Sequence, residues 1–202
     1  MANLLKFNGN KVAKEYYIND YGNQIRNFTK SVFLRIREIK YKDKFIIKED
    51  LYPGEYVVQI GKKIIQTNKD EKFDDFDKSF ELLKRESLMH SMNLIKSDLK
   101  KLGIEHDNFF SETELIENKL VEKAVNYLKK NNYVQEGYLE PPKGDRDETW
   151  KKTKRLIFKS TLFGDDTDRA MQKNDGSWTY FANDVGYHMD KVNRNYKYLI
   201  NV

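Results

Sequence analysis

Two carboxylates stand where the chain is expected to pass from one secondary-structure element to the next. Glu112 directly follows an expected strand and begins a helix, and Asp184 lies at the junction of a hairpin with the last helix. Open α/β sheets bind ligands at the carboxyl ends of their strands, where such junctions lie. Two carboxylates that meet there would hold a cation, and a guanidinium suits them best because its donors are planar and paired. The hydroxyl of Tyr180, four residues before Asp184, would complete this polar wall.

Each of these three residues also has an explanation that involves no ligand. An acidic side chain in the first turn of a helix is stabilised by the helix dipole, and an aspartate before a helix is commonly its cap. A tyrosine near the end of a strand is commonly packed against its neighbours. Spacing alone therefore leaves both explanations open.

Two further polar groups lie in expected turns. Asn19, Asp20, Asn23 and Gln24 form a polar turn after an expected strand, and they would line a nucleotide or substrate site or form an ordinary helix cap. The segment 164–168 carries three aspartates, which would bind Mg²⁺ or form a solvated turn, and the turn is favoured. We predict no metal site, because the chain has no cysteine and its three histidines are widely spaced.

The composition indicates a folded, basic protein. The 202 residues are 39% hydrophobic and 13% aromatic, which supports a real core rather than disorder. The net charge of +5 fits a nucleic-acid partner, but a lysine excess from an AT-rich genome explains it equally well. The basic stretch at 143–159 would contact phosphates or form a solvated loop. No apolar run approaches the ~20 residues that span a bilayer, and the N-terminus resembles no secretion signal, so we expect a cytoplasmic protein without membrane contact.

The pattern of apolar residues predicts an α/β fold with a mainly parallel sheet, because strands and helices alternate at both ends. All 202 residues are expected to belong to one domain, in which 1–40 and 161–202 form βα units around a helix-rich insertion at 41–160. The expected strands are 12–18, 104–110, 133–139 and 198–202, with a hairpin over 168–183 that turns at Asp175 and Gly176; the expected helices are 25–39, 80–102, 115–128 and the stretch after Asp184.

Several strings resemble, in order, those of bacterial arginyl-tRNA synthetases. Residues 14–25 resemble the segment after the first signature of that family, and Phe110-Ser-Glu-Thr113 resembles its strand-to-helix junction. Residues 163–169 resemble its G-D-D-x-D-R segment, and residues 175–191 resemble its T-Y-F-A-x-D-x-x-Y-H-x-D-K block. The matches run from one end of the chain to the other, and the strings at 140–144 and 160–161 resemble an alphaproteobacterial form.

The resemblance implies a partial Rossmann-like, class I synthetase nucleotide-binding fold with a helix-rich insertion. It also implies that the chain is part of an arginine–tRNA ligase. Such an enzyme activates L-arginine with ATP and Mg²⁺ and transfers it to tRNA-Arg. Glu112 and Asp184 would then hold the arginine guanidinium, and Tyr180 would offer its hydroxyl. Asn19, Asp20, Gly22 and Gln24 match a family motif that lines the same cleft, but the resemblance assigns no separate role to each of them.

The chain also departs from the family pattern. It contains no H-x-G-H signature and no K-M-S-K-type loop, so the resemblance covers the whole chain but a minority of the enzyme. These missing motifs supply much of the electrostatic stabilisation of adenylate formation. We therefore assign no catalytic residue and no tightly bound ATP, and we expect the chain alone to be inactive.

Two other functions remain open at this point. The chain would be a stand-alone, non-catalytic remnant that binds RNA or arginine, or a purely structural protein. The retention of Glu112, Tyr180 and Asp184 argues against the structural protein. A sheet cut at both sides would expose strand edges, which favours self-association.

Overall fold

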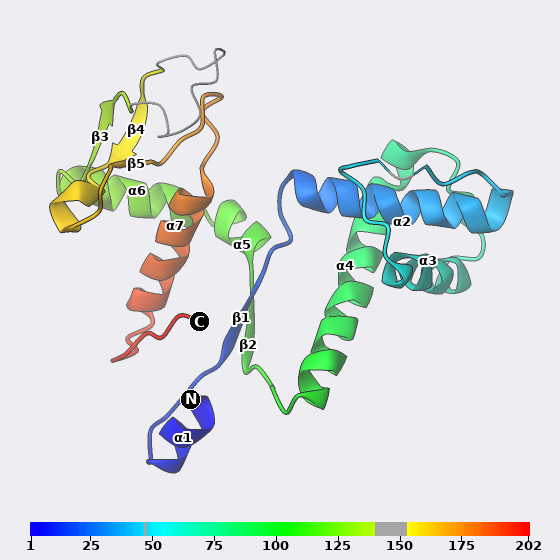
Figure 1. Cartoon of the computed structure of the whole chain (residues 1–202), viewed down its shortest axis with the longest axis horizontal. Helices are drawn as coiled ribbons and strands as arrows, with labels where there is room; N and C mark the ends of the chain where they lie inside the picture. The colour runs from blue at the N-terminus through cyan, green and yellow to red at the C-terminus, as the bar shows by residue number, and fades with distance from the viewer. Residues whose placement is uncertain (47, 140–152) are drawn as a thin grey trace. The chain divides into compact units, whose positions relative to one another are not determined.

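The structure is a computed structural model that describes residues 1–46, 48–139 and 153–202. It contains both helices and strands and divides into two compact units, Met1–Ser111 and Glu112–Val202 (Figure 1). The string at 140–144 and most of the basic stretch at 143–159 lie outside the described residues. The expected division into two βα units and an insertion stays a prediction.

Unit 1 is a helical bundle inserted between two parallel strands. The first strand, β1 (Glu15–Ile18), pairs in parallel with β2 (Asn108–Ser111), with Glu15 opposite Asn108 and Ile18 opposite Ser111. Parallel strands need a long crossover connection, and the helices between them provide it. The helices of this unit are α1 (Ala2–Phe7), α2 (Asn23–Tyr41), α3 (Glu55–Thr67) and α4 (Phe76–Lys101).

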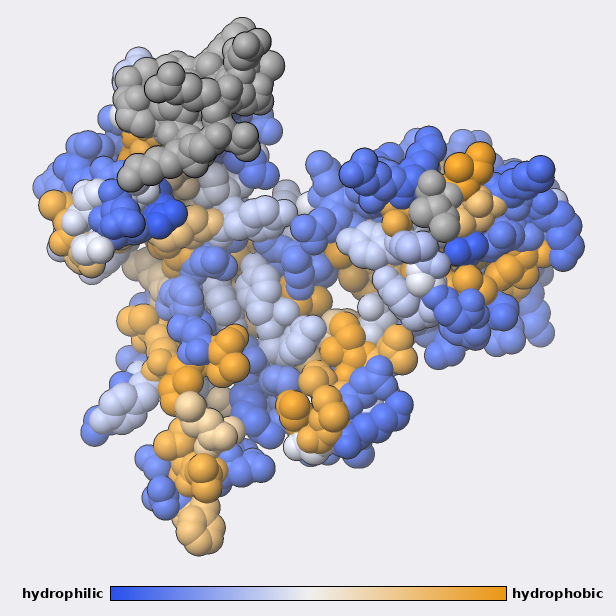
Figure 2. All heavy atoms as spheres, viewed as in Figure 1, coloured by the Kyte–Doolittle hydropathy of each residue, from blue (hydrophilic) through white to orange (hydrophobic). Residues whose placement is uncertain are grey.

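The three long helices of unit 1 form because each has one apolar face to bury. Asp75 caps α4 by accepting a hydrogen bond from the backbone N–H of Lys78 at 2.9 Å. Hydrophilic residues cover much of the outward surface of these helices, as the amphipathic pattern requires (Figure 2). The core between α2, α3 and α4 consists of Phe28, Val32, Phe33, Ile36, Val57, Ile60, Ile64, Phe73 and Leu83.

Unit 2 packs helices against a small antiparallel sheet. The sheet has the order β3-β4-β5, and its strands are β3 (Val134–Gly137), β4 (Arg155–Phe158) and β5 (Arg169–Ala170). The helical elements are α5 (Glu112–Glu117), α6 (Leu120–Lys130), the 3₁₀ turn η1 (Ser160–Phe163) and α7 (Tyr180–Asn193). None of the helices among the described residues is long and apolar enough to cross a membrane.

A glycine lets α7 lie against α6. A Cβ atom built on Gly186 would stand 3.0 Å from the Cα atom and 3.1 Å from the backbone nitrogen of Val121. Gly186 and Val121 are both buried, so neither backbone can move away into solvent. The two helices therefore approach each other at this point because one of them lacks a side chain.

Three expected elements differ from the structure. The stretch 115–128 is divided between α5 and α6, because Lys119 adopts a left-handed conformation with φ at 52°. The hairpin over 168–183 keeps its turn, with Gln172 bridged to Trp178, but its second half is already the start of α7. Residues 198–202 form no strand, because no described segment pairs with them.

The start of α7 also corrects the roles expected for two residues. Tyr180 is the first residue of the helix rather than the end of a strand, and the cap is Thr179, whose hydroxyl accepts a hydrogen bond from the N–H of Ala182 at 3.2 Å. Asp184 therefore lies in the second turn and caps nothing. Threonine is a strong cap in its own right, which explains why the helix begins five residues earlier than expected, at Tyr180 rather than after Asp184.

Replacing Gly186 with alanine tests the contact between α6 and α7. We expect Gly186→Ala to lower the free energy of unfolding by about 1–3 kcal/mol, since the new methyl group must displace backbone. The matched control is Gly61→Ala in α3, where the nearest atom to a new Cβ is a side-chain carbon of Ile36 at 3.4 Å. That variant should be neutral or stabilising by up to ~1 kcal/mol. Urea unfolding followed by circular dichroism measures both, and equal stability of the two variants would contradict this packing.

Candidate functional site

Glu112 is a buried carboxylate held by one identified partner. Its side chain is 4% exposed, and its Oε1 atom accepts a hydrogen bond from Nδ2 of Asn183 at 2.9 Å. Burial of a carboxylate is costly unless hydrogen bonds compensate for the lost water. The sequence correctly places Glu112 at the first position of a helix directly after a strand. Asn183 therefore fixes where this carboxylate lies.

The position of Asn183 follows from how α7 is anchored. The hydroxyl of Thr179 donates to the carbonyl oxygen of Ala170 at 2.8 Å, which ties the start of α7 to the end of β5. Ala182, Asn183 and Gly186 then form the buried face of the helix. The amide of Asn183 is thereby directed toward α5, the helix that carries Glu112.

Tyr180 and Asp184 lie on the exposed face of the same helix. They are four residues apart, so their side chains are neighbours along α7, and both are exposed. Asp184 directly follows Asn183 in the chain. The structure thus brings Glu112 and Asn183 into contact, and it places Tyr180 and Asp184 on the exposed face of the first two turns of the helix that carries Asn183.

This set of groups is rich in hydrogen-bond acceptors. The Oδ1 atom of Asn183 is buried and has no hydrogen-bond partner among the described residues. Two carboxylates and an amide oxygen suit a planar cation that carries several N–H donors. Among the described residues no three acidic, histidine or cysteine side chains gather closely enough to hold a metal ion.

His188 lies one turn beyond Asp184 on α7. Burial lowers the pKa of its imidazole, the nearby charge of Lys191 lowers it further, and the carboxylate of Asp184 raises it. The imidazole is therefore mainly neutral at pH 7, and its titration responds to the charge of Asp184.

The polar group that follows β1 belongs to unit 1. The hydroxyl of Ser111 donates to Oδ2 of Asp20 at 2.7 Å, which joins the ends of the two parallel strands. Nδ2 of Asn19 donates to Oε1 of Gln24 at 3.4 Å, and Gly22 adopts φ +87°, a conformation that favours glycine. Their expected position in one cleft with Glu112 stays a prediction.

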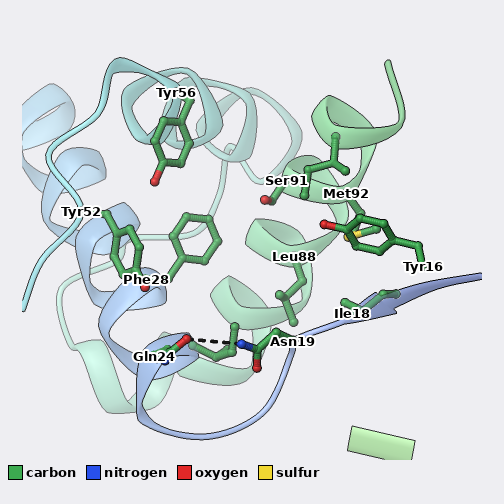
Figure 3. A pocket seen from close by; sticks show the side chains of 12 residues that line it. Tyr16, Ile18, Asn19, Gln24, Phe28, Tyr52, Tyr56, Leu88, Ser91 and Met92 are labelled. Carbon is green, nitrogen blue, oxygen red and sulfur yellow. Dashed lines mark hydrogen bonds between the residues drawn. The ribbon is translucent and has the colours of Figure 1, made fainter. Parts of the chain in front are cut away.

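Asn19 and Gln24 line a hollow of about 260 Å³ within unit 1 (Figure 3). Aromatic side chains surround much of this hollow, as the close view shows. Its other lining residues are Tyr16, Ile18, Ile25, Phe28, Tyr52, Tyr56, Leu88, Ser91, Met92 and Ile95. The sequence identified the two amides but not the aromatic wall, because the rings come from α2, α3 and segments beside them.

The aspartates at 164–168 are engaged in local bonds. Arg169 donates from Nε and from Nη2 to the two oxygens of Asp165, each at 2.7 Å, and this paired contact lowers the pKa of Asp165 to about 2. Asp168 accepts from the backbone N–H and the hydroxyl of Thr161 at 3.1 and 2.8 Å. These bonds favour the turn over a magnesium site.

Asn183 is the site residue that the sequence analysis missed. Asparagine favours helix caps and turns, so its residue type gave no signal of a buried partner within a helix. The position of Asn183 on the helix did give a signal, because the small residues Ala182 and Gly186 mark the inward face, and position 183 belongs to the same face. A polar residue on such a face needs a buried partner, and Glu112 is that partner.

Comparisons with known proteins place the whole chain within larger relatives. It is 55% identical to the arginine–tRNA ligase of Pelagibacter ubique, over all of this chain and 35% of that protein. It is 47% identical to the arginine–tRNA ligase of Ehrlichia chaffeensis, over 99% of this chain and 35% of that protein. No family model matches the chain.

A solved structure agrees with these sequence matches. A crystal structure described as an arginyl-tRNA synthetase from Campylobacter jejuni superimposes with a TM-score of 0.78 at 27% identity. The match covers 96% of this chain and 39% of that one. The resemblance predicted from the ordered motifs is confirmed.

Loss of the amide that holds Glu112 should destabilise unit 2. We expect Asn183→Ala to lower the free energy of unfolding by about 1–3 kcal/mol, because a buried carboxylate loses a donor. Asn193→Ala, at the exposed end of the same helix, is the control and should change it by less than ~0.5 kcal/mol. Chemical denaturation measures both, and a stable Asn183→Ala variant would show that Glu112 does not depend on this bond.

The imidazole of His188 should report the charges around it. We expect Asp184→Asn to lower the pKa of His188, because the variant removes the negative charge that raises it, and Lys191→Met to raise the pKa for the opposite reason. An NMR titration of the imidazole Cε1–H signal measures both shifts. Shifts of the same sign in the two variants would contradict the placement of these groups.

Proposed function

This chain is a relative, over its whole length, of one portion of bacterial arginine–tRNA ligases, and from this premise we propose that it supplies the arginine-binding wall of such an enzyme. It spans about a third of the length of the curated relatives that it matches. The activity proposed for the complete enzyme is activation of arginine by ATP with Mg²⁺, followed by transfer to tRNA-Arg. The proposed location is the cytoplasm.

The observation that carries this proposal is the buried carboxylate of Glu112, held by Asn183 on the helix that also bears Asp184. Asp184 is exposed and so remains able to meet a ligand from solvent. We propose that these two carboxylates accept hydrogen bonds from the guanidinium and that the hydroxyl of Tyr180 borders the same site. Asn183 acts as a positioning residue for Glu112.

Such a site would select arginine by its charge and by its donors. A charge-assisted hydrogen bond contributes about 1.5–3 kcal/mol. A ligand without the charge or a donor leaves a buried acceptor unpaired, which a polar site rejects strongly. L-citrulline has the shape of arginine with a neutral urea in place of the guanidinium, so it should bind poorly.

The parallel pair β1–β2 with its helical crossover supports a partial Rossmann-like fold. In the complete enzyme, we propose that Asn19, Asp20, Gly22 and Gln24 line the cleft that receives the substrates. No residue of this chain is assigned to the ATP phosphates, because the sequence contains neither H-x-G-H nor a K-M-S-K-type loop. The isolated chain should therefore show no charging of tRNA.

A chimaeric enzyme tests the proposal. The chain replaces the matching segment of the Pelagibacter ubique enzyme, and charging of tRNA-Arg is measured against arginine concentration. We expect the chimaera to charge tRNA and to discriminate against L-citrulline. Asp184→Asn should raise the KM for arginine about tenfold or more, which corresponds to loss of one charge-assisted hydrogen bond.

Glu117→Gln is the matched control, because it removes an exposed carboxylate from the last position of α5. It should leave the KM for arginine unchanged. An Asp184→Asn chimaera with the parent KM would contradict the proposed guanidinium wall. Charging by the isolated chain would contradict its assignment as a binding part alone.

A further inference from the structure

The indole of Trp178 ties the segment before α7 to α6. Its Nε1–H donates to Oε1 of Glu122 at 3.3 Å, and the two residues are 56 positions apart in the chain. Glu122 lies in the first turn of α6, where the helix dipole favours a negative charge. Its other oxygen, Oε2, is buried and has no hydrogen-bond partner among the described residues. The indole therefore compensates for part of the water that this carboxylate loses.

The hairpin that carries Trp178 is held at its root. Met171 is fully buried, and its backbone N–H donates to the carbonyl oxygen of Leu156 in β4 at 2.9 Å. The N–H of Thr179 donates to the carbonyl oxygen of Met171 at 3.1 Å, and Gln172 is bridged to Trp178, which together close the hairpin. The indole thus reaches α6 from a backbone that β4 already supports.

Trp178 and Gly186 hold α7 at two places against the same part of α6. Gly186 packs on the backbone of Val121, and the indole bonds to Glu122, the next residue of α6. Tyr180 begins α7 between these two contacts. A helix held before its first residue and again in its second turn resists both sliding along its axis and rotation about it. The direction in which the Tyr180 side chain leaves the helix is thereby fixed.

The same hairpin also contacts the ring of Tyr180. Lys173, in the first arm of the hairpin, places its ammonium 5.7 Å from the centroid of that ring. Tyr180 is nevertheless 64% exposed. The direction of an exposed ring depends on how the backbone beneath it is held, and Trp178 anchors that backbone two positions before Tyr180.

We propose that Trp178 is a positioning residue for the hydroxyl of Tyr180 and that it acts through its bond to Glu122. This inference rests on the proposed function, in which that hydroxyl borders the site of the arginine guanidinium. Loss of the indole donor frees the start of α7 and spreads the hydroxyl over several positions, so arginine binds more weakly. Neither Trp178 nor Glu122 touches the substrate, and the effect falls on KM rather than on kcat.

Arginine kinetics of the chimaeric enzyme test the proposal. Trp178→Phe keeps a large ring and removes the donor, so it should raise the KM for arginine about fivefold, the effect of one hydrogen bond, and leave kcat within about twofold of the parent value. Glu122→Ala should do the same. Glu122→Gln keeps an acceptor oxygen for the indole, so its KM should stay within about twofold of the parent value.

Tyr127→Phe is the matched control, because it removes one polar group from an exposed ring on α6. It should leave the KM for arginine unchanged. Circular dichroism checks that each variant folds. A Trp178 that only stabilises unit 2 would change the free energy of unfolding without changing the KM, and that result would overturn the proposal.

A double-mutant cycle tests whether Trp178 acts through Tyr180. Tyr180→Phe removes the hydroxyl that is positioned, so adding Trp178→Phe to it should raise the KM for arginine no further. Effects of the two substitutions that multiply would overturn the positioning role. The guanidinium wall is tested apart from this, because Asp184→Asn should raise the KM whether or not Trp178 positions Tyr180.

The hydrogen bond itself has a readout that needs no enzyme activity. In the whole chain, the NMR signal of the Trp178 indole N–H is assigned by its absence in Trp178→Phe. A hydrogen bond to an ionised carboxylate is short and strong and deshields the proton, so this signal should move upfield in Glu122→Ala. An unchanged signal would show that Glu122 does not hold the indole, which would also overturn the proposal.

Discussion

The close approach of α7 to α6 at Gly186 is the constraint on which the candidate site depends. A side chain at this position would collide with the backbone of Val121. Because the two helices come this close, the inward face of α7 is buried. Asn183 lies on that face and donates a hydrogen bond to Glu112. The hydroxyl of Thr179 fixes the beginning of the same helix on β5. Packing and capping together decide where both carboxylates stand.

The two carboxylates differ in what surrounds them, and this difference suits recognition of a cation. Glu112 is buried and oriented by an amide, so little of its freedom remains to be lost when a ligand binds. Asp184 is exposed, so in the proposed site it would supply its charge at the solvent side. In the proposed site, one oriented buried acceptor and one solvated acceptor would favour a ligand that carries both a positive charge and several donors.

The sequence predicted those parts of the structure that depend on local chemistry. The long helices α2 and α4 were expected because their apolar residues recur at helical spacing. The placement of Glu112 at a strand-to-helix junction was also expected, and the structure confirms it. Ordered motifs sufficed to identify the relatives.

The remaining features depend on contacts between distant segments. The hydrogen bond from Asn183 to Glu112 joins residues 71 positions apart, and no local pattern indicates it. The start of α7 was misplaced because Asp184 and Thr179 are both good caps and only the contact with β5 selects Thr179. The aromatic hollow was missed for a similar reason, since its rings come from β1, α2, α3 and the segment before α3.

A crystal structure of the chimaeric enzyme with L-arginine bound tests the central claim most directly. The account predicts guanidinium nitrogens about 2.7–2.9 Å from carboxylate oxygens of both Glu112 and Asp184, the usual length of such charged hydrogen bonds. Asn183 should keep its bond to Glu112 in that complex. A guanidinium that contacts neither carboxylate, with Glu112 still bonded to Asn183, would show that this buried carboxylate serves the packing of unit 2 rather than the substrate.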